Sequence, residues 1–363
     1  MKIKIEKRYL VFPTNSKMKN KNITFSVSSK KLYDLRCKLD NISPDFYAYI
    51  DVSEYIGKEL EISVSPKMQI NCTQADEMAK DEENIAVRRP RFHFTTTNGW
   101  LNDPNGLVYL NGKYHMFYQY NPADTVWENM HWGHAVSEDL MHWEEKDVAL
   151  FPDDSGMMFS GSAIVDEKNL LGFSENDKPV AVFFYTATKP FSQHMAYSTD
   201  GCKTLIKYDK NPVVPNIIAE NRDPKVIFCD ELGCYIMALY LNGNTYAILK
   251  SDNLTKWEIL QKIEMTDDSE CPDIFPLIDN NNNRKWVFMG AKDTYIVGEF
   301  EDGKFKELQG IKKLHFGKHA YAGQTFSNVP DGRRIRVTWD ASGLKGERFT
   351  SQMMLPTEYS LVE

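Results

Sequence analysis

The sequence predicts an all-β protein in which a five-bladed β-propeller follows a small β-sandwich. A repeated strand pattern predicts the propeller, and a change of pattern near residue 85 predicts the sandwich. Apolar strand-like runs recur five times at intervals of 49 to 67 residues, with equivalent points at Tyr118, Tyr185, Tyr240, Met289 and Trp339. Repeats of roughly 40 to 50 residues built from several short strands are typical of propeller blades.

A second recurring element supports the count of five blades. Ser137–Trp143 and Ser251–Trp257 share Ser, Leu and Trp in register, and Ser198–Gly201 is a looser copy of their beginning. The serines lie 61 and 53 residues apart, close to the spacing of the strand-like runs. We therefore expect five blades between about residues 92 and 350, in a catalytic domain that spans residues 86–350.

The first 85 residues have a different pattern. The runs Ile23–Val27, Phe46–Val52 and Leu60–Val64 are short and partly alternating, and clusters of Asn, Ser, Pro and Gly separate them. This pattern favours a small β-sandwich over residues 1–85. Residues 74–84 are rich in charge and poor in large apolar side chains, which predicts a linker.

Composition excludes several classes of partner. The net charge of −8 argues against nucleic acid, because phosphate binding needs concentrated Lys and Arg. Residues 1–8 lack the apolar core of a signal peptide, and no later stretch is apolar enough for a membrane span. We expect a cytoplasmic protein as the sequence stands, and a secreted or surface-located one if a leader has been removed.

The sequence shows no pattern for a cofactor or a metal. The six cysteines form no Cys-x-x-Cys pair and have no zinc-type histidine spacing, so they are expected to be free thiols. A Gly-rich cofactor loop and a dense cage of oxygen ligands for Ca²⁺ are also missing. We therefore expect neither a cofactor nor a metal.

Three acidic residues, Asp103, Asp223 and Glu270, each lie one or two positions ahead of a proline. Proline cannot donate to a strand ladder and pushes the preceding residue toward an extended conformation, so each motif predicts a strand that ends at a sheet edge. The acids are 120 and 47 residues apart, close to two repeats and one repeat. In a propeller they would recur on the inner strands of different blades and converge on one funnel.

Three converging carboxyl groups suggest glycoside chemistry. A retaining glycosidase needs a carboxylate nucleophile and a carboxylic acid for the leaving oxygen, and a further carboxylate often holds the sugar. Taken alone, a tetrapeptide such as Asp-Pro-Asn-Gly at residues 103–106 is a good turn sequence and usually does no more than turn the chain. The three acids together favour the catalytic interpretation.

The same motifs carry a family resemblance. In order along the chain they are WLNDPNG (residues 100–106), FYQYNP (117–122), FSGS (159–162), RDPKV (222–226) and ECPD (270–273). Between about Arg91 and Leu355 the sequence resembles glycoside hydrolase family 32, which contains invertases, inulinases, levanases and related β-fructofuranosidases. The resemblance implies a five-bladed propeller and a retaining hydrolase that releases terminal β-D-fructofuranosyl residues from sucrose, levan or inulin by double displacement.

Other functions remain open beside this one. A fructosyltransferase of the same fold would differ only in whether water or a sugar accepts the fructosyl group. A catalytically silent fructan-binding protein is less consistent with the presence of all three acids. An arabinan- or xylan-cleaving propeller is disfavoured by the WLNDPNG and ECPD motifs. In each case the partner would be a small-molecule or polysaccharide substrate.

The resemblance also implies roles for individual residues. Asp103 matches the family's nucleophile, Asp223 its transition-state stabiliser and Glu270 its acid/base. The other matches are polar positions around the sugar pocket, Asn102, Gln119, Ser160 and Arg222, and apolar walls, Trp100, Trp127 and Phe159. Without the motif context, a core role would explain Trp127 and Phe159 better.

The chain departs from the family pattern at two places. Members usually continue past residues 352–358 into a C-terminal β-sandwich, whereas this sequence stops at Glu363, so we expect residues 351–363 to begin a linker toward an absent domain. The residue before Glu270 is commonly aromatic or Met, but here it is Ser269. An apolar neighbour would raise the pKa of the acid, so we expect either another apolar wall or the like charges of residues 267–268 to do so.

Overall fold

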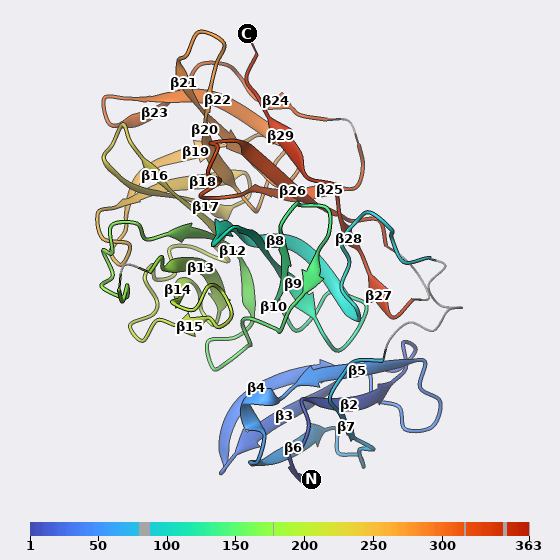
Figure 1. Cartoon of the computed structure of the whole chain (residues 1–363). Helices are drawn as coiled ribbons and strands as arrows, with labels where there is room; N and C mark the ends of the chain where they lie inside the picture. The colour runs from blue at the N-terminus through green and yellow to red at the C-terminus, as the bar shows by residue number, and fades with distance from the viewer. Residues whose placement is uncertain (80–87, 177, 316, 344–346, 363) are drawn as a thin grey trace.

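The computed structural model describes residues 1–79, 88–176, 178–315, 317–343 and 347–362. These residues form 29 strands and one short 3₁₀ helix, η1 (Ser53–Tyr55), in two units that follow each other along the chain (Figure 1). Within the described residues, no helix has the length and apolar character needed to cross a membrane.

The N-terminal unit consists of two facing antiparallel sheets. One has the order β1 (Lys2–Lys4), β6 (Glu59–Ser65), β3 (Lys21–Val27), β4 (Lys30–Cys37), and the other β5 (Phe46–Asp51), β2 (Tyr9–Thr14), β7 (Thr73–Ala75). Alternate side chains such as Phe12, Phe25 and Leu35 are fully buried in one apolar cluster. The predicted linker is wrong at residues 74–75, which belong to β7 and pair with β2, and its residues 80–84 lie outside the described part of the chain.

The second unit is a ring of five antiparallel sheets. The first blade consists of β8 (Gly99–Leu110), β9 (Lys113–Asn121), β10 (His131–Ser137) and β11 (Glu144–Glu145). The second consists of β12 (Met158–Val165), β13 (Ala181–Thr188), β14 (Phe191–Ser198) and β15 (Ile206–Lys207). The third consists of β16 (Arg222–Cys229), β17 (Cys234–Asn242), β18 (Thr245–Ser251) and β19 (Glu258–Glu264). The last two are β20 (Asp273–Ile278), β21 (Arg284–Met289), β22 (Thr294–Glu301), β23 (Lys304–Glu307), β24 (Lys312–Lys313); and β25 (Ala320–Thr325), β26 (Arg334–Asp340), β28 (Gln352–Met353), β29 (Thr357–Tyr359). The predicted five-bladed propeller is therefore confirmed.

Both repeats that predicted the propeller have a structural counterpart. The five apolar runs form the second strand of each blade, β9, β13, β17, β21 and β26. The Ser–Leu–Trp element is a turn at the end of the third strand. In it the Ser137 hydroxyl accepts the Leu140 N–H at 2.8 Å, and the Trp143 indole donates to the Leu140 carbonyl at 2.9 Å. Residues 251–257 repeat both contacts at 2.9 Å.

The inner strands β8, β12, β16, β20 and β25 contact one another in a closed ring. Strand β27 (Phe349–Thr350) closes it by pairing in parallel with β8 of the first blade. The prediction that residues 351–363 begin a linker is wrong for residues 352–353 and 357–359, because β28 and β29 pair with β26 as outer strands of the fifth blade. These strands are only two and three residues long, too short to leave an apolar pattern.

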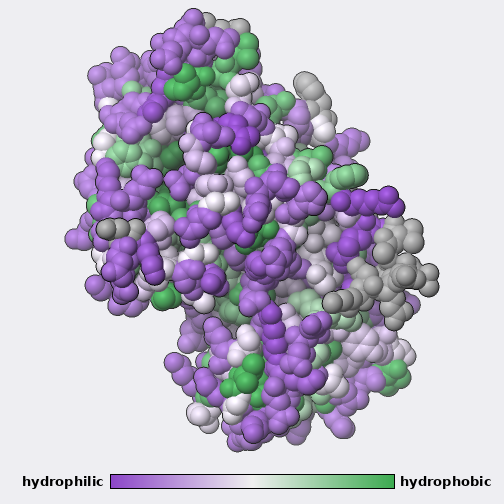
Figure 2. Space-filling model, in the orientation of Figure 1, coloured by the Kyte–Doolittle hydropathy of each residue, from purple (hydrophilic) through white to green (hydrophobic). Residues whose placement is uncertain are grey.

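A buried ion pair ties three inner strands together. Lys225 of β16 lies 3.1 Å from Asp273 of β20, and both side chains are 2% exposed. Lys225 also donates to the Thr325 carbonyl of β25 at 2.7 Å, and the Thr325 N–H donates to Asp273 at 2.7 Å. Outside this interior, the face of the molecule in Figure 2 is mainly hydrophilic over both units, with small separate apolar patches.

Candidate functional site

The three acids predicted from sequence lie on neighbouring parts of the inner ring. Asp103 belongs to β8, Asp223 to β16, and Glu270 to the turn that leads into β20. The two aspartates flank one sulfur atom, because the Cys271 Sγ is 3.4 Å from a carboxylate oxygen of each. Glu270 is the residue before this cysteine and acts electrostatically on both aspartates. We call Asp103, Asp223 and Glu270 the carboxylate site.

Local irregularities of the backbone aim these side chains. The ladder of β8 shifts register between Leu101 and Pro104, and that of β16 shifts between Arg222 and Lys225. The prediction that the strands end at the prolines is wrong for both, since each strand continues beyond a bulge. An inner edge strand tolerates the missing proline N–H, and a bulge re-aims the adjoining side chain.

Three residues at the site have a strained backbone conformation. Asp223, Glu270 and Cys271 have φ values of 65°, 61° and 35°, in the left-handed region that is costly for residues other than glycine. Hydrogen bonds hold these conformations. The Asp223 N–H donates to the Thr186 hydroxyl at 3.0 Å, the Cys271 N–H donates to the Asp223 carboxylate at 3.0 Å, and the Tyr246 hydroxyl donates to the Glu270 carbonyl at 3.1 Å.

The carboxylate of Asp103 is oriented by its neighbours on β8 and β12. The Ser160 hydroxyl donates to one carboxylate oxygen at 2.6 Å, and the Asn102 amide donates to the other at 3.2 Å. The Trp100 indole in turn donates to the Asn102 side-chain oxygen at 3.1 Å, which fixes the amide orientation. Trp100 and Asn102 thus form a chain of contacts to one carboxylate oxygen of Asp103, and Ser160 contacts the other.

Glu270 is held by two donors from adjacent blades. Arg222 donates to one carboxylate oxygen at 2.6 Å, and the Tyr321 hydroxyl donates to the other. The Arg222 guanidinium also lies 3.8 Å from the Asp223 carboxylate and stacks over the Tyr240 ring at 4.7 Å. Arg222 is therefore shared between two of the three acids.

Two of the three carboxyl groups have a raised pKa and the third has a lowered one. Burial raises the pKa of Asp103 to about 6 and the pKa of Asp223 to about 7. The charge of Glu270 adds to both increases, and the charge of Asp103 adds to the increase at Asp223. Burial also acts to raise the pKa of Glu270, but the donors Tyr321 and Arg222 outweigh it, so this pKa is lowered. The expectation that an apolar wall or residues 267–268 raise the pKa of Glu270 is therefore wrong for the ligand-free protein.

The remaining predicted residues lie around this centre. Trp127 is 48% exposed and packs edge-on against Phe159, which packs edge-on against Phe191. Phe159 directly precedes Ser160 in β12, and the Ser160 hydroxyl donates to Asp103, so this aromatic row adjoins the carboxylate site through β12. Gln119 is buried and donates to the Met158 carbonyl at 2.9 Å, so it links the first two blades.

Sequence reasoning missed several residues that position the acids. Tyr321 and Thr186 contact Glu270 and Asp223 from other blades, and nothing near them in the sequence marks them. The sequence contains one signal for Asp268, because an acidic residue two positions before Glu270 is well placed to accept hydrogen bonds that fix this turn. Asp268 accepts the Thr294 hydroxyl at 2.6 Å and the Lys292 N–H at 2.9 Å. Among the described residues, no group of three or more His, Cys, Asp or Glu side chains is arranged to hold a metal ion.

Comparison with known proteins gives a family match and several similar relatives. Residues 93–361 match the family model of the glycosyl hydrolases family 32 N-terminal domain. The chain is 38% identical to a levanase of Bacillus subtilis over 297 residues, 75% of this chain and 43% of the levanase. It is 37% identical to an invertase of Debaryomyces hansenii over 310 residues, 77% of this chain and 58% of the invertase. The chain thus spans about half the length of these relatives.

Solved structures give the same result. The exo-inulinase of Aspergillus awamori superposes with a TM-score of 0.68 at 30% identity, covering 76% of this chain and 64% of the inulinase chain. The β-fructofuranosidase of Schwanniomyces occidentalis, complexed with fructosyl-erythritol, gives a TM-score of 0.69 at 32% identity, covering 76% of this chain and 59% of the other.

Proposed function

The chain belongs to glycoside hydrolase family 32, and from this membership we propose that it releases terminal β-D-fructofuranosyl residues from sucrose or from fructans such as levan and inulin. The observation that carries the proposal is the convergence of Asp103, Asp223 and Glu270 on one point of the inner ring, with Cys271 between the aspartates. Two reactive carboxyl groups with an additional stabilising one are what double displacement at a sugar requires.

In the first half of the reaction, Asp103 attacks the anomeric carbon of the fructosyl unit. The bond from this carbon to the glycosidic oxygen breaks, a bond to the Asp103 carboxylate forms, and Glu270 gives its proton to the departing oxygen. Ser160 and Asn102 hold the attacking carboxylate in place. In the second half, Glu270 takes a proton from water, the water oxygen bonds to the anomeric carbon, and Asp103 is released.

In the transition state, Asp223 stabilises positive charge and does not itself transfer a proton. Departure of the glycosidic oxygen builds positive charge on the sugar ring, and an adjacent carboxylate stabilises this charge. Asp223 lies on the opposite side of the Cys271 sulfur from Asp103. Both aspartates can therefore contact the same fructosyl unit. Sugar hydroxyls that donate to Asp223 would stabilise its ionised form and so lower its raised pKa.

Substrate binding must also move a proton to Glu270. In the free protein Arg222 and Tyr321 keep Glu270 ionised, while burial favours a proton on the aspartates. Ionisation of Asp223 by the bound sugar releases a proton inside the site and frees Arg222 to pair with Asp223, which lies 3.8 Å away. The negative charge on Asp223 and the loss of the Arg222 contact both raise the proton affinity of Glu270, which takes up the released proton and then acts as the acid.

Product analysis tests this function. We expect fructose and glucose from sucrose, and fructose from levan or inulin, when the protein is incubated with each sugar and sampled by chromatography over time. Asp103→Asn, which keeps the shape but cannot form the covalent intermediate, should be inactive on all three. Absence of fructose from every substrate would refute the proposal, and fructosyl oligomers in place of fructose would identify a transferase.

A further inference from the structure

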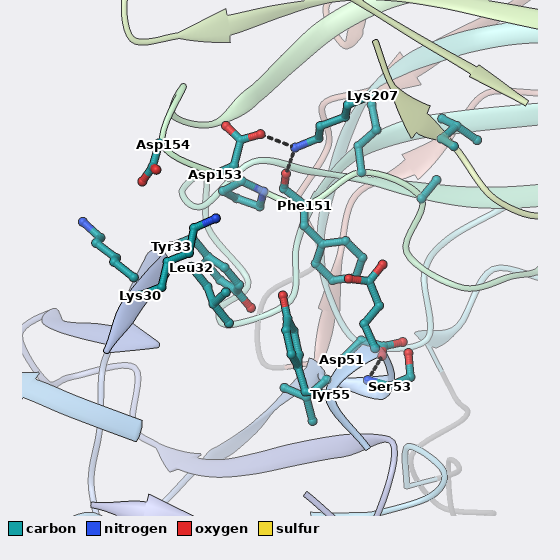
Figure 3. A pocket seen from close by; sticks show the side chains of 17 residues that line it. Lys30, Leu32, Tyr33, Asp51, Ser53, Tyr55, Phe151, Asp153, Asp154 and Lys207 are labelled. Carbon is teal, nitrogen blue, oxygen red and sulfur yellow. Dashed lines mark hydrogen bonds and ion pairs between the residues drawn. The ribbon is translucent and has the colours of Figure 1, made fainter. Parts of the chain in front are cut away.

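A cavity of about 390 Å³ lies where the N-terminal unit meets the propeller (Figure 3). Its wall on the N-terminal side comes from residues 30–33 at the start of β4 and from residues 51–55, which include η1. Its wall on the propeller side comes from residues 149–154 and from Lys207 of β15. The volume falls in the roughly 300–1,000 Å³ range of small-molecule sites.

Specific contacts between the two units hold this cavity in shape. Asn129 of the propeller accepts the Arg36 N–H and donates to the Arg36 carbonyl, both at 2.8 Å. Lys38 pairs with Asp124 at 2.6 Å, and Ala123 packs into the apolar core of the N-terminal unit. The cavity therefore lies along an interface that specific contacts hold in place.

Aromatic side chains gather around the cavity from both units. Tyr33 and Tyr55 enter from the N-terminal unit and Phe151 from the propeller (Figure 3). Neither tyrosine hydroxyl hydrogen-bonds to another residue in the described part of the chain, although Tyr33 is only 6% exposed. Both hydroxyl oxygens keep contact with solvent in the cavity, so they are free to donate to and accept from a bound molecule.

Most charges that line the cavity are already paired. Lys207 donates to Asp153 and to the Phe151 carbonyl, each at 2.6 Å. Asp51 accepts from Arg8 at 2.9 Å, and Lys31 pairs with Asp34 at 2.6 Å. Paired charges supply hydrogen-bonding groups without a strong net field, which suits a neutral molecule better than an ion. Aromatic faces beside hydroxyl and carboxylate groups match a sugar, which has C–H faces and a rim of hydroxyls.

We propose that this interdomain cavity binds a saccharide unit of a fructan and acts as a second, non-catalytic carbohydrate site. The inference rests on the proposed function for the identity of the sugar. The segment that forms the propeller wall runs directly into β12, which carries Ser160 of the carboxylate site. Fully extended, the chain from Asp153 to Ser160 spans at most about 25 Å. A polymeric fructan can therefore occupy the cavity while another part of it reaches Asp103.

Binding stoichiometry tests this site directly. The probe is nystose, a short fructo-oligosaccharide, titrated calorimetrically into the full chain carrying Asp103→Asn so that it is not cleaved. We expect two sites in this parent, and one site when Tyr55→Ala or Ser53→Trp is added. Ser53 is exposed, so Ser53→Trp fills the cavity without removing a core contact. Tyr47→Ala, at a half-exposed tyrosine that does not line the cavity, should keep both sites.

The active chain provides a second readout. With Tyr55→Ala we expect the KM for levan to rise roughly three- to tenfold through lost avidity, while kcat and the KM for sucrose stay unchanged. A single nystose site in the parent, or two sites retained in both Tyr55→Ala and Ser53→Trp, would overturn the cavity proposal. A chain that cleaves none of the sugars would refute the proposed function instead, and the stoichiometry would still decide the cavity.

Discussion

At Asp223 both the backbone and the side chain are held in states that cost free energy. The residue is not glycine but has a φ of 65°, and its buried carboxyl group has a pKa raised to about 7. Such strain persists only where the surroundings over-determine it, as Thr186 and Cys271 do here. A carboxylate that destabilises the free protein is suited to stabilise positive charge on a bound sugar.

The raised pKa values give a first prediction at this scale. We expect kcat/KM on sucrose to be bell-shaped and highest between about pH 6 and pH 7. Below the lower value Asp103 is protonated and cannot attack, and above the higher value the site loses the proton that Glu270 must donate. Initial rates from pH 4 to pH 9 check this, and activity that keeps rising above pH 8 would contradict it.

A second prediction concerns stability. The folded protein binds a proton at Asp223 more tightly than the unfolded chain, so the contribution of this group to the unfolding free energy falls as the pH rises from about 4 to about 7 and then levels off. The variant Asp223→Asn has no ionisable group at this position, so its unfolding free energy does not undergo this decrease. At about 1.4 kcal/mol per pKa unit, the variant should be more stable than the wild type by a few kcal/mol at pH 8.

Thermal or denaturant unfolding at two pH values checks the effect. At pH 4 the difference between Asp223→Asn and the wild type should nearly vanish, which makes that measurement the internal control. The variant should meanwhile turn over sucrose far more slowly. A variant that is equally destabilised at both pH values would show that the pKa of Asp223 is not raised.

The sequence identified the acids because each lies in a motif, but it could not rank their proton affinities. That ranking depends on Tyr321 of β25 and on the orientation of Arg222, which reach Glu270 from other blades. Tyr321 is 51 residues from Glu270 along the chain, so no local pattern connects the two. The prediction that the pKa of Glu270 is raised was wrong for this reason.

At the scale of elements, the second strand of every blade was predictable and the inner strands were less so. Strands such as β13 and β17 are apolar on both faces because neighbouring blades cover them. Inner strands such as β12 and β25 contain Ser, Gly, Gln and Thr because they face a polar axis, and bulges interrupt their alternation. Apolar periodicity therefore finds the blades but not the strands that carry the site.

The buried pair between Lys225 of β16 and Asp273 of β20 gives a third prediction. Asp273→Asn leaves a buried cation without its charge partner, so we expect the unfolding free energy to fall by about 3–5 kcal/mol. Glu301→Gln, which removes the exposed partner of Lys306, should leave the unfolding free energy almost unchanged. Denaturant unfolding of both variants makes the comparison, and equal effects would contradict it.

At the scale of the whole molecule, the buried residues beyond the acids bear on how a substrate can bind. Lys225 of β16, Asp273 of β20 and Thr325 of β25 are buried and bonded to one another. We expect this cluster to stop a fructan chain from threading through the ring, so that only the end of the chain reaches Asp103.

A fourth prediction follows for product release. Fructose should be the main early product from levan, with the polymer shortened one unit at a time. Size-resolved chromatography during the first few per cent of the reaction checks this. Early accumulation of mixed-length oligomers with little fructose would indicate a groove that binds the middle of the chain.

The stereochemistry of the released sugar tests the central proposal most directly. If Asp103 forms a covalent fructosyl intermediate that water then opens, configuration at the anomeric carbon inverts twice and is retained. NMR spectra recorded within the first minutes of sucrose cleavage, before mutarotation, distinguish the two fructofuranose anomers. We expect β-D-fructofuranose to appear first, and α-D-fructofuranose as the first product would contradict Asp103 as the nucleophile.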